Sequence, residues 1–334
     1  MLTMTSRFQE LDTHKPLPLL ADAQRDASVH CWSTEVIDAL TLADVVKRPL
    51  LVRGEPGTGK TQLARAAAQH LGWALHAETI HPRYEAQDLV YRFDAVRRLA
   101  DAQAQRELDD SEYFEPGPIW KAFGWDSANG YGSCRGQAHP AGHVILIDEI
   151  DKADSDLPNS LLEVLGQRSL WIAPLARLIG GPGVAAPLIV ITTNEERELP
   201  PAFLRRCVVL NLAPDPAMTY LRWLVERGRA HFGVVDGDAG VPPRLTEAVL
   251  WRAAAQLVAD RQVARDAGLS PPGPAEYLDL LQALCKLAPG AEAAQLGWLD
   301  RLSQYAFVKH GDREDQPALS QHRPPESGPA ATGP

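Results

Sequence analysis

A glycine-rich stretch near the start of the chain has the residue types and spacing that bind phosphate. It reads Gly54-Glu-Pro-Gly-Thr-Gly-Lys-Thr61, and it lies between an apolar run at 49–53 and an amphipathic helical pattern at 62–71. The glycines let the backbone curl so that its N–H groups point at phosphate oxygens, and the following helix N-terminus adds a favourable dipole. A ligand-free glycine turn is the alternative, but the complete pattern in this context favours a phosphate-binding loop.

The positions of this loop have distinct expected roles. Lys60 is expected to contact the β- and γ-phosphates of ATP, and Thr61 to offer its hydroxyl group to Mg²⁺. ATP and Mg²⁺ are therefore the expected cofactors. The residues predicted to bind the nucleotide are Gly54, Glu55, Pro56, Gly57, Thr58, Gly59, Lys60, Thr61 and Gln62.

Two carboxylates, Asp148 and Glu149, directly follow an apolar run at 144–147. A strand in this position places them at its C-terminal edge, where α/β sheets bind ligands. Asp148 is predicted to hold Mg²⁺ together with Thr61, and Glu149 to orient and polarise the attacking water. A solvated acidic turn is the alternative, and the upstream phosphate-binding loop disfavours it.

Three further features are candidates for the same chemistry. Asn194 ends another apolar run and could hydrogen-bond the γ-phosphate or the attacking water, or it could be an ordinary turn residue. Arg206, with Arg205 beside it, could reach the γ-phosphate in a neighbouring subunit, although two surface arginines are the simpler interpretation. Asp151 could take part in catalysis, cap a helix or pair with Lys152.

Short apolar runs alternate with helical patterns in the first two thirds of the chain, at 50–52, 74–77, 144–147, 188–192 and 208–212. This alternation predicts an α/β fold, with a parallel five-stranded sheet that has helices on both faces. An earlier helix is expected near 33–46, and a hairpin at 169–183 is a candidate contact surface. After Pro214 only helical spacing remains, at 216–232, 244–265, 275–287 and about 292–308.

These patterns divide the chain into four parts. We expect an N-terminal arm at 1–40, a nucleotide-binding core at 41–213, a small all-helical domain at 214–310 and a tail at 311–334. The tail is expected to be disordered because it has too few apolar residues to pack.

Composition narrows the possible partners and the location. The chain has 43 acidic and 33 basic residues, and this balance makes nucleic acid an unexpected partner. The 4 cysteines are widely spaced and favour a reducing, cytoplasmic location. No apolar stretch approaches the length of a membrane span, so no membrane association is expected.

In these motifs the chain resembles the AAA+ ATPases, and within them the MoxR-type ATPases. The resemblance is strong over residues 48–212 and weaker to about 308. Its more specific matches are DLVYRFD at 88–94, FEPGPI at 114–119, DEIDKAD at 148–154 and ELPPAFLRR at 198–206.

The resemblance implies an AAA+ P-loop NTPase core followed by a helical lid, assembled in a ring that is usually a hexamer. Lys60, Thr61, Asp148, Glu149 and Asn194 would then belong to one subunit's site. Arg206 would be the arginine finger that reaches the next subunit, with Arg205 as its close competitor. MoxR-type proteins are similar to chaperones that remodel partner complexes, often together with a protein that carries a von Willebrand A domain.

The chain departs from the family in two places. The start of the third lid helix, at 270–276, lacks the family's basic sensor, for which Arg261 or Arg265 could substitute. The stretch 121–143 is interpreted as a long polar insertion.

Tyr91 and Arg92 could face the pore or a partner, or they could lie on a solvent-exposed helix face.

Cys134, His139 and His143 have a spacing that zinc could use, but we predict no structural metal there.

The function expected from the sequence is that of an ATPase that hydrolyses ATP to remodel partner complexes. Three other functions are alternatives. One is an ATP-gated oligomeric scaffold with negligible turnover, the second is a P-loop kinase for a small molecule, and the third is a DNA-acting motor. The intact pair Asp148 and Glu149 argues against a scaffold without turnover. The helical lid fits a kinase poorly, and the excess of acidic residues disfavours a DNA-acting motor.

Overall fold

The computed structural model describes residues 7–21, 27–154, 156–167, 169–172, 175–181, 183–215, 218–233 and 244–308. The chain divides into two compact units. The first comprises Met1–Leu19, Trp32–Gly54 and Gly59–Leu212, and the second comprises Leu20–Cys31, Glu55–Thr58 and Ala213–Pro334. The tail that the sequence predicts at 311–334 lies outside the described residues.

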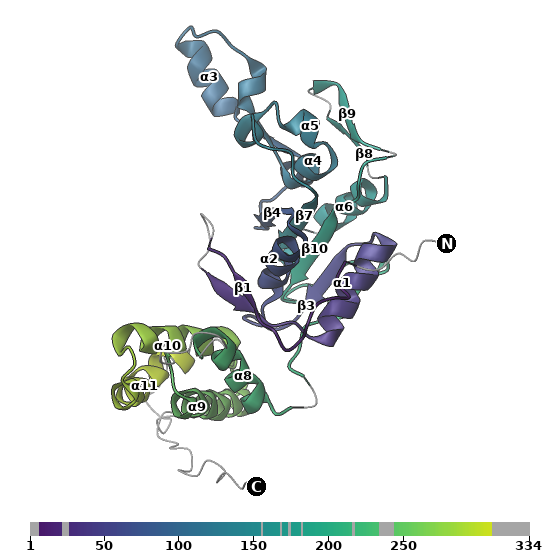
Figure 1. Ribbon diagram of the computed structural model, residues 1–334. Coiled ribbons are helices and arrows are strands. Elements are labelled where there is room, and N and C mark those ends of the chain that lie inside the picture. Colours follow the sequence, from purple (N-terminus) through teal and green to yellow (C-terminus); the bar gives the residue numbers. More distant parts are fainter. Residues whose placement is uncertain are drawn as a thin grey trace. The chain divides into compact units, whose positions relative to one another are not determined.

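A five-stranded sheet forms the centre of the first unit (Figure 1). Its strand order is β11-β3-β10-β7-β4, and each neighbouring pair is parallel. The predicted α/β fold with a parallel five-stranded sheet is therefore confirmed. The strands are β3 (Leu50–Arg53), β4 (Ala74–Thr79), β7 (His143–Asp148), β10 (Leu188–Thr193) and β11 (Val208–Asn211).

Alternate residues of the central strands face opposite helix layers, which explains the near-continuous apolar runs in the sequence. One face packs against α1 (Thr34–Val46) and α2 (Lys60–Leu71), with Leu50, Val52, Leu146 and Val190 in one buried cluster. The other face packs Leu51, Ile145, Ile147 and Ile191 against the remaining layer. Full burial of each such side chain contributes about 1.5–3 kcal/mol. The helices of the second layer are α4 (Pro118–Phe123), α6 (Asp156–Gln167) and α7 (Pro201–Leu204).

The N-terminal part of the chain contributes to this core. The Ser33 hydroxyl group caps α1 by accepting the N–H of Val36 at 3.4 Å, so the helix expected near 33–46 is present. Phe8 is fully buried in the same cluster as α1. The short strands here are β1 (Leu17–Leu19) in the first unit and β2 (Ser28–His30) in the second.

Two hairpins extend from the sheet. In the first, β5 (Tyr91–Phe93) pairs antiparallel with β6 (Phe114–Pro116), so the helix suggested for Tyr91 and Arg92 is wrong. In the second, β8 (Ser169–Ile172) pairs with β9 (Arg177–Gly180), as the sequence predicts. Trp171 and Leu178 pair across it and are 57% and 61% exposed, but a contact role stays a prediction. The short connecting elements are η1 (Ala86–Leu89), α3 (Ala95–Gln103), η2 (Asp110–Tyr113) and η4 (Ile150–Lys152).

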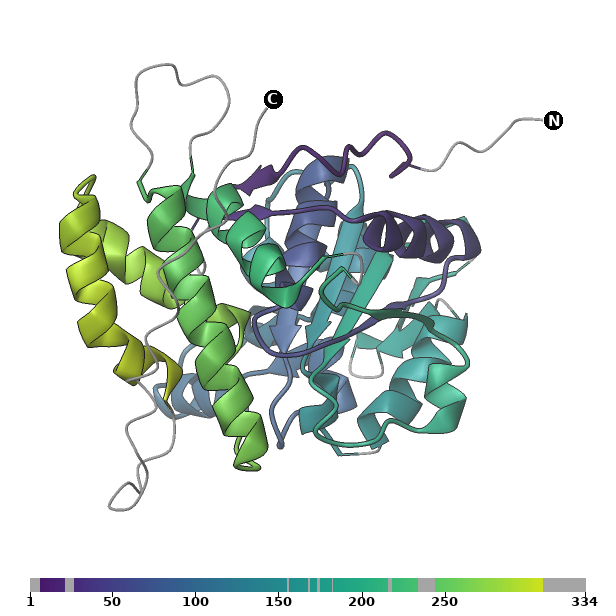
Figure 2. The ribbon, with the colours of Figure 1, turned by 90° about the horizontal axis from the view of Figure 1, so that it is seen from below.

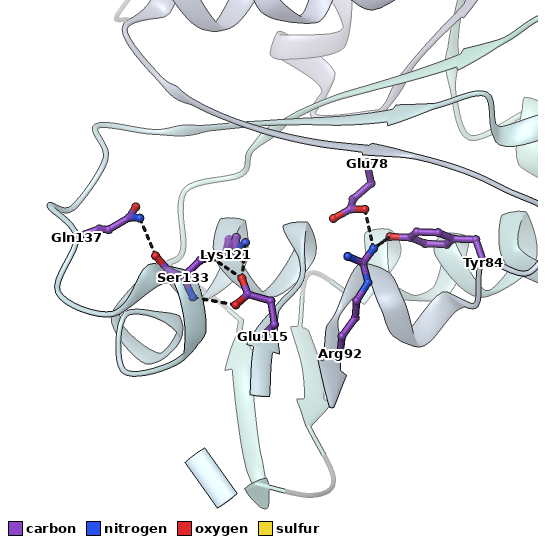
Figure 3. Close-up of polar contacts among 7 residues, drawn as sticks. All are labelled: Glu78, Tyr84, Arg92, Glu115, Lys121, Ser133 and Gln137. Carbon is purple, nitrogen blue, oxygen red and sulfur yellow. Dashed lines mark hydrogen bonds and ion pairs between the residues drawn. The ribbon is translucent and has the colours of Figure 1, made fainter. Parts of the chain in front are cut away.

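The polar insertion at 121–143 is folded against the second hairpin. It contains α5 (Trp125–Ala128) and η3 (Gly132–Cys134), and Trp125 and Cys134 are buried with Ile172 and Ile179. The Glu115 carboxylate of β6 accepts the backbone N–H and the hydroxyl of Ser133 (Figure 3). Sequence polarity alone misses this packing because the buried side chains are widely spaced within a glycine-rich stretch.

The second unit is mainly helical (Figure 2). Its buried cluster combines side chains from all the long helices, among them Leu224, Leu257, Leu281 and Leu299. The helices are α8 (Tyr220–Phe232), α9 (Glu247–Asp266), α10 (Pro274–Leu287) and α11 (Glu292–Phe307). Among the residues that the structure describes, no helix combines the length and apolarity that crossing a membrane requires.

Candidate functional site

The glycine-rich loop connects β3 to α2 and has the curled backbone that phosphate binding requires. Gly57 and Gly59 have φ values of 80° and 98°, a region that residues with a Cβ atom rarely adopt. Gly59 is the N-cap of α2, so the loop leads directly into the N–H groups of the first helical turn. The Lys60 ammonium group donates to the Gly54 carbonyl oxygen at 2.7 Å and thereby closes the loop.

Lys60 lies in an acidic environment. Burial lowers the pKa of its ammonium group, while the charges of Asp148, Asp151 and Glu149 act in the opposite direction. The loop lysine and the carboxylates after β7 are therefore close enough to interact electrostatically. A site with these charges favours a ligand that carries both phosphate groups and a divalent cation.

Asp148 ends β7 and Glu149 follows it, so both carboxylates lie at the carboxyl edge of the sheet, as the sequence predicts. The Thr61 hydroxyl oxygen of α2 lies 3.0 Å from both carboxylate oxygens of Asp148, although the two residues are far apart in the chain. Oxygen ligands of this kind suit Mg²⁺, which binds through one or two protein groups and keeps several waters. Thr61 and Asp148 therefore fit the predicted Mg²⁺ site.

Asn194 lies immediately after β10 and points at the second carboxylate. Its side-chain amide donates to Glu149 Oε1 at 3.1 Å. Glu149 and Asn194 thus form a pair on neighbouring strands, with their polar atoms at the same sheet edge as the loop. The carboxylate and the amide lie side by side, and both can contact a water molecule at this edge of the sheet.

Two further residues contact Glu149 and Asn194 or their neighbours. The sequence left the role of Asp151 open and did not indicate Thr192. The Asp151 carboxylate accepts the backbone N–H groups of Asn194 at 3.4 Å and Glu196 at 3.0 Å. The Thr192 hydroxyl contacts both Asp148 and Glu149. A detectable signal for Thr192 is the change from an apolar strand to two threonines directly before Asn194.

Arg205 and Arg206 do not join the other predicted residues. Both are exposed, and they precede β11, whose first residue, Val208, donates its N–H to the Pro49 carbonyl oxygen at 2.8 Å. Because β11 and β3 are parallel, this places the arginines at the amino end of the strands. The four residues of β11 span about 13 Å, so the arginines are separated from the carboxyl edge by roughly that length.

The second unit contains the candidate substitutes for the missing lid sensor. Arg261 of α9 is buried, and its guanidinium group binds both carboxylate oxygens of Glu55 at 2.6 Å. It also donates to the Pro272 carbonyl oxygen at 2.7 Å. Arg265 lies farther from the same carboxylate, at 4.0 Å. Of the two arginines, Arg261 has the stronger contact with the loop segment 55–58, and a sensing role stays a prediction.

The histidines of the insertion serve a different arrangement from a zinc site. His143 of β7 contacts His76 of β4 at 2.9 Å between ring nitrogens, and Trp125 lies against both rings. His139 instead lies 3.3 Å from the Asp126 carboxylate. Within the described ranges, no group of three or more His, Cys, Asp and Glu side chains is arranged to hold a metal ion.

The pair of the half-buried His76 and the buried His143 predicts a loss of stability in acid. Burial, more than any neighbouring charge, lowers the pKa of His76 from 6.5 to about 3 and that of His143 from 6.5 to about 4. The unfolded chain therefore binds more protons than the folded chain below pH 6.5, and the free energy of unfolding falls as pH drops toward about 4.

This prediction is checked by the thermal midpoint of unfolding between pH 7 and pH 4 in the wild type and in a His143→Gln variant. We expect a flatter pH profile in the variant, because it lacks one of the two titrating groups. Parallel profiles would contradict a role for the pair in acid sensitivity.

The fold and this site define a class of protein. The P-loop between β3 and α2, the two carboxylates at the end of β7 and the helical domain later in the chain form the AAA+ P-loop NTPase fold with a helical lid. In a comparison with family models, residues 49–207 match the model described as the AAA domain (dynein-related subfamily).

Comparison with curated proteins found no match. Among solved structures, the chain is similar to a protein presumed to be an ATPase from Cytophaga hutchinsonii, with 14% sequence identity. The alignment covers 81% of this chain and 84% of that chain, with a TM-score of 0.38. A similarity at this level carries no conclusion about function.

Proposed function

We propose that this chain is a Mg²⁺-dependent ATP hydrolase of the MoxR type that remodels partner protein complexes. The observation that supports ATP hydrolysis is that two pairs of residues meet at one edge of the sheet. These pairs are Thr61 with Asp148 and Glu149 with Asn194. A scaffold that only binds ATP needs the first pair. The second pair has no comparable use without hydrolysis, since it places a carboxylate and an amide where an attacking water is activated.

In the proposed reaction a water molecule attacks the γ-phosphate in line, and the residues of the site have different roles. Lys60 and the backbone N–H groups of the loop bind and orient the phosphates. Glu149 orients the water and accepts hydrogen bonding from it, while Asn194 fixes the direction of the Glu149 carboxylate. Thr61 and Asp148 would hold Mg²⁺, which would supply positive charge to neutralise the charge that develops on the phosphate oxygens.

Loss of the Lys60 ammonium group is expected to weaken ATP binding. A hydrogen bond to a charged group contributes about 1.5–3 kcal/mol, which corresponds to a Kd for ATP raised about 10- to 100-fold in Lys60→Ala. Binding of a fluorescent ATP analogue measures the change, and Lys286→Ala on α10 is a control of equal charge. An unchanged Kd in Lys60→Ala would remove the loop from the proposed site.

The chain is proposed to act as a ring, with hexamers as the usual form in the family it resembles. The support is the position of Arg206 and Arg205, which are exposed and about a strand's length from their own carboxylates. An arginine placed there serves a neighbour's site more readily than its own. A partner with a von Willebrand A domain and a cytoplasmic location are proposed by the same resemblance, and all 4 cysteines are free thiols, as a reducing compartment favours.

The test of the proposed function measures ATP turnover and oligomeric state together across protein concentration. Turnover that rises as the wild type assembles supports a hydrolase with a site shared between subunits. Assembly with ATP but without turnover would instead identify an ATP-gated scaffold.

A further inference from the structure

We propose that Thr192 and Asp151 are positioning residues that join the end of β10 to the acidic turn after β7, and so hold Glu149 and Asn194 as one unit. The inference rests on the proposed ATP hydrolysis and deepens it. Neither residue needs to contact ATP. Each acts through a hydrogen bond to a residue of the site.

Thr192 links the two strands in one direction. Its hydroxyl oxygen lies 2.5 Å from Asp148 Oδ1 and accepts the Glu149 N–H at 2.9 Å. A carboxylate only accepts, so the single hydroxyl proton is donated to Asp148, and an oxygen lone pair remains for the Glu149 N–H. Thr192 is fully buried, so water does not substitute for either bond. The position therefore requires a small side chain that donates and accepts at once.

The link acts on a backbone conformation that needs support. Glu149 has a φ of 60°, a left-handed conformation that a non-glycine residue keeps only where the surrounding structure holds it. The backbone N–H of Glu149 donates a hydrogen bond to the Thr192 hydroxyl oxygen, so this N–H has an acceptor within the turn. The orientation of the Glu149 side chain thus depends on a hydroxyl group from the neighbouring strand.

Asp151 forms the second link, in which a side chain after β7 binds the backbone after β10. It is 2% exposed, and its carboxylate accepts the N–H groups of Asn194 and Glu196, at 3.4 Å and 3.0 Å. Hydrogen bonds from backbone N–H groups to a carboxylate are charge-assisted and hold the loop strongly. The neighbouring Lys152 binds Glu196 at 2.6 Å and adds a second contact to the same loop.

Together the two links determine the 3.1 Å contact between Asn194 and Glu149. Without them, the two side chains remain in the protein, but their relative position is no longer fixed. A misplacement of about 1 Å near reacting groups costs up to about 10²-fold in rate. The expected defect is therefore in kcat, and at saturating Mg²⁺ the Kd for ATP stays nearly unchanged.

The experiment compares Thr192→Val, Thr192→Ser, Asp151→Asn and a matched control, Thr193→Val. Thr193 is also buried, but its hydroxyl contacts Glu195 and neither carboxylate of the site. We expect kcat to fall about 10- to 100-fold in Thr192→Val and Asp151→Asn, with recovery in Thr192→Ser and no comparable loss in Thr193→Val. A merely structural role would instead lower the thermal midpoint and weaken ATP binding in parallel with kcat.

A second readout separates the two links. Thr192→Val also loosens Asp148, so its ATP binding should require a higher Mg²⁺ concentration, whereas that of Asp151→Asn should not. Wild-type kcat and Mg²⁺ dependence in Thr192→Val, or a Thr192→Ser variant as defective as Thr192→Val, would overturn the proposal. If the wild type does not turn over ATP, the proposed function fails, and the Mg²⁺ dependence of ATP binding still decides for or against the link from Thr192 to Asp148.

Discussion

ATP turnover by the Glu149→Gln variant is expected to fall about 10²- to 10⁴-fold, the usual contribution of a positioned general base. Glutamine keeps the size of the side chain and a carbonyl oxygen, so it still accepts the hydrogen bond from Asn194 Nδ2, which lies 3.1 Å from Oε1 in the wild type. It loses the negative charge that polarises the attacking water in the proposed function. ATP binding and assembly should therefore remain while hydrolysis stops.

The measurement is single-turnover hydrolysis of ATP with the Kd for ATP determined on the same preparation. Glu195→Gln is the control, since Glu195 is an exposed carboxylate near the same sheet edge that pairs with Arg53 at 3.3 Å. The control should keep its turnover. Normal hydrolysis by Glu149→Gln would remove this residue from the water-activating role, and a lost affinity for ATP would show that its charge serves binding.

Turnover by the Arg206→Ala variant is expected to fall about 10³- to 10⁵-fold, the range for a trans-acting arginine in nucleotide hydrolysis. The arginine lies at the amino end of β11, away from its own carboxylates, and in the proposed ring its charge would reach the γ-phosphate of a neighbouring chain. Arg205→Ala is the matched comparison, because it removes the same charge from the adjacent exposed position. A larger loss in Arg205→Ala would exchange the roles of the two residues.

Mixing the two inactive variants tests whether the arginine acts between chains. A Glu149→Gln chain still presents Arg206, and an Arg206→Ala chain still has an intact carboxylate pair. Their mixture should regain turnover at boundaries that combine the two intact parts. Co-assembly without any recovery would show that the arginine does not act in a neighbour's site.

The sequence by itself determined the elements that carry the site. Apolar runs long enough for strands and bounded by turn residues predicted all five strands of the sheet, and helical spacing predicted the lid helices. The glycine pattern and the acidic pair were recognisable because their chemistry depends on residues adjacent in the chain. The carboxyl ends of parallel strands share one edge, so the approach of Thr61, Asp148 and Asn194 also followed from the predicted fold.

Other features depend on contacts between distant parts of the chain, which neither local propensity nor spacing encodes. The sequence left open whether Arg92 faces the pore or a partner or lies on a solvated helix face. Antiparallel pairing with β6 makes it part of a strand, where it binds Glu78 at 2.7 Å (Figure 3). The insertion at 121–143 appears polar, yet its few apolar side chains are buried by the second hairpin.

The roles of Thr192 and Asp151 required the tertiary structure for the same reason. Thr192 could be read as an ordinary strand threonine, and Asp151 as a partner of Lys152. The pairing register of β10 with β7 brings the Thr192 hydroxyl to the acidic turn and the Asp151 carboxylate to the N–H groups after Asn194. Sequence fixes which groups are available, whereas strand order and register decide which of them meet, because hydrogen bonds form only at short range and in particular directions.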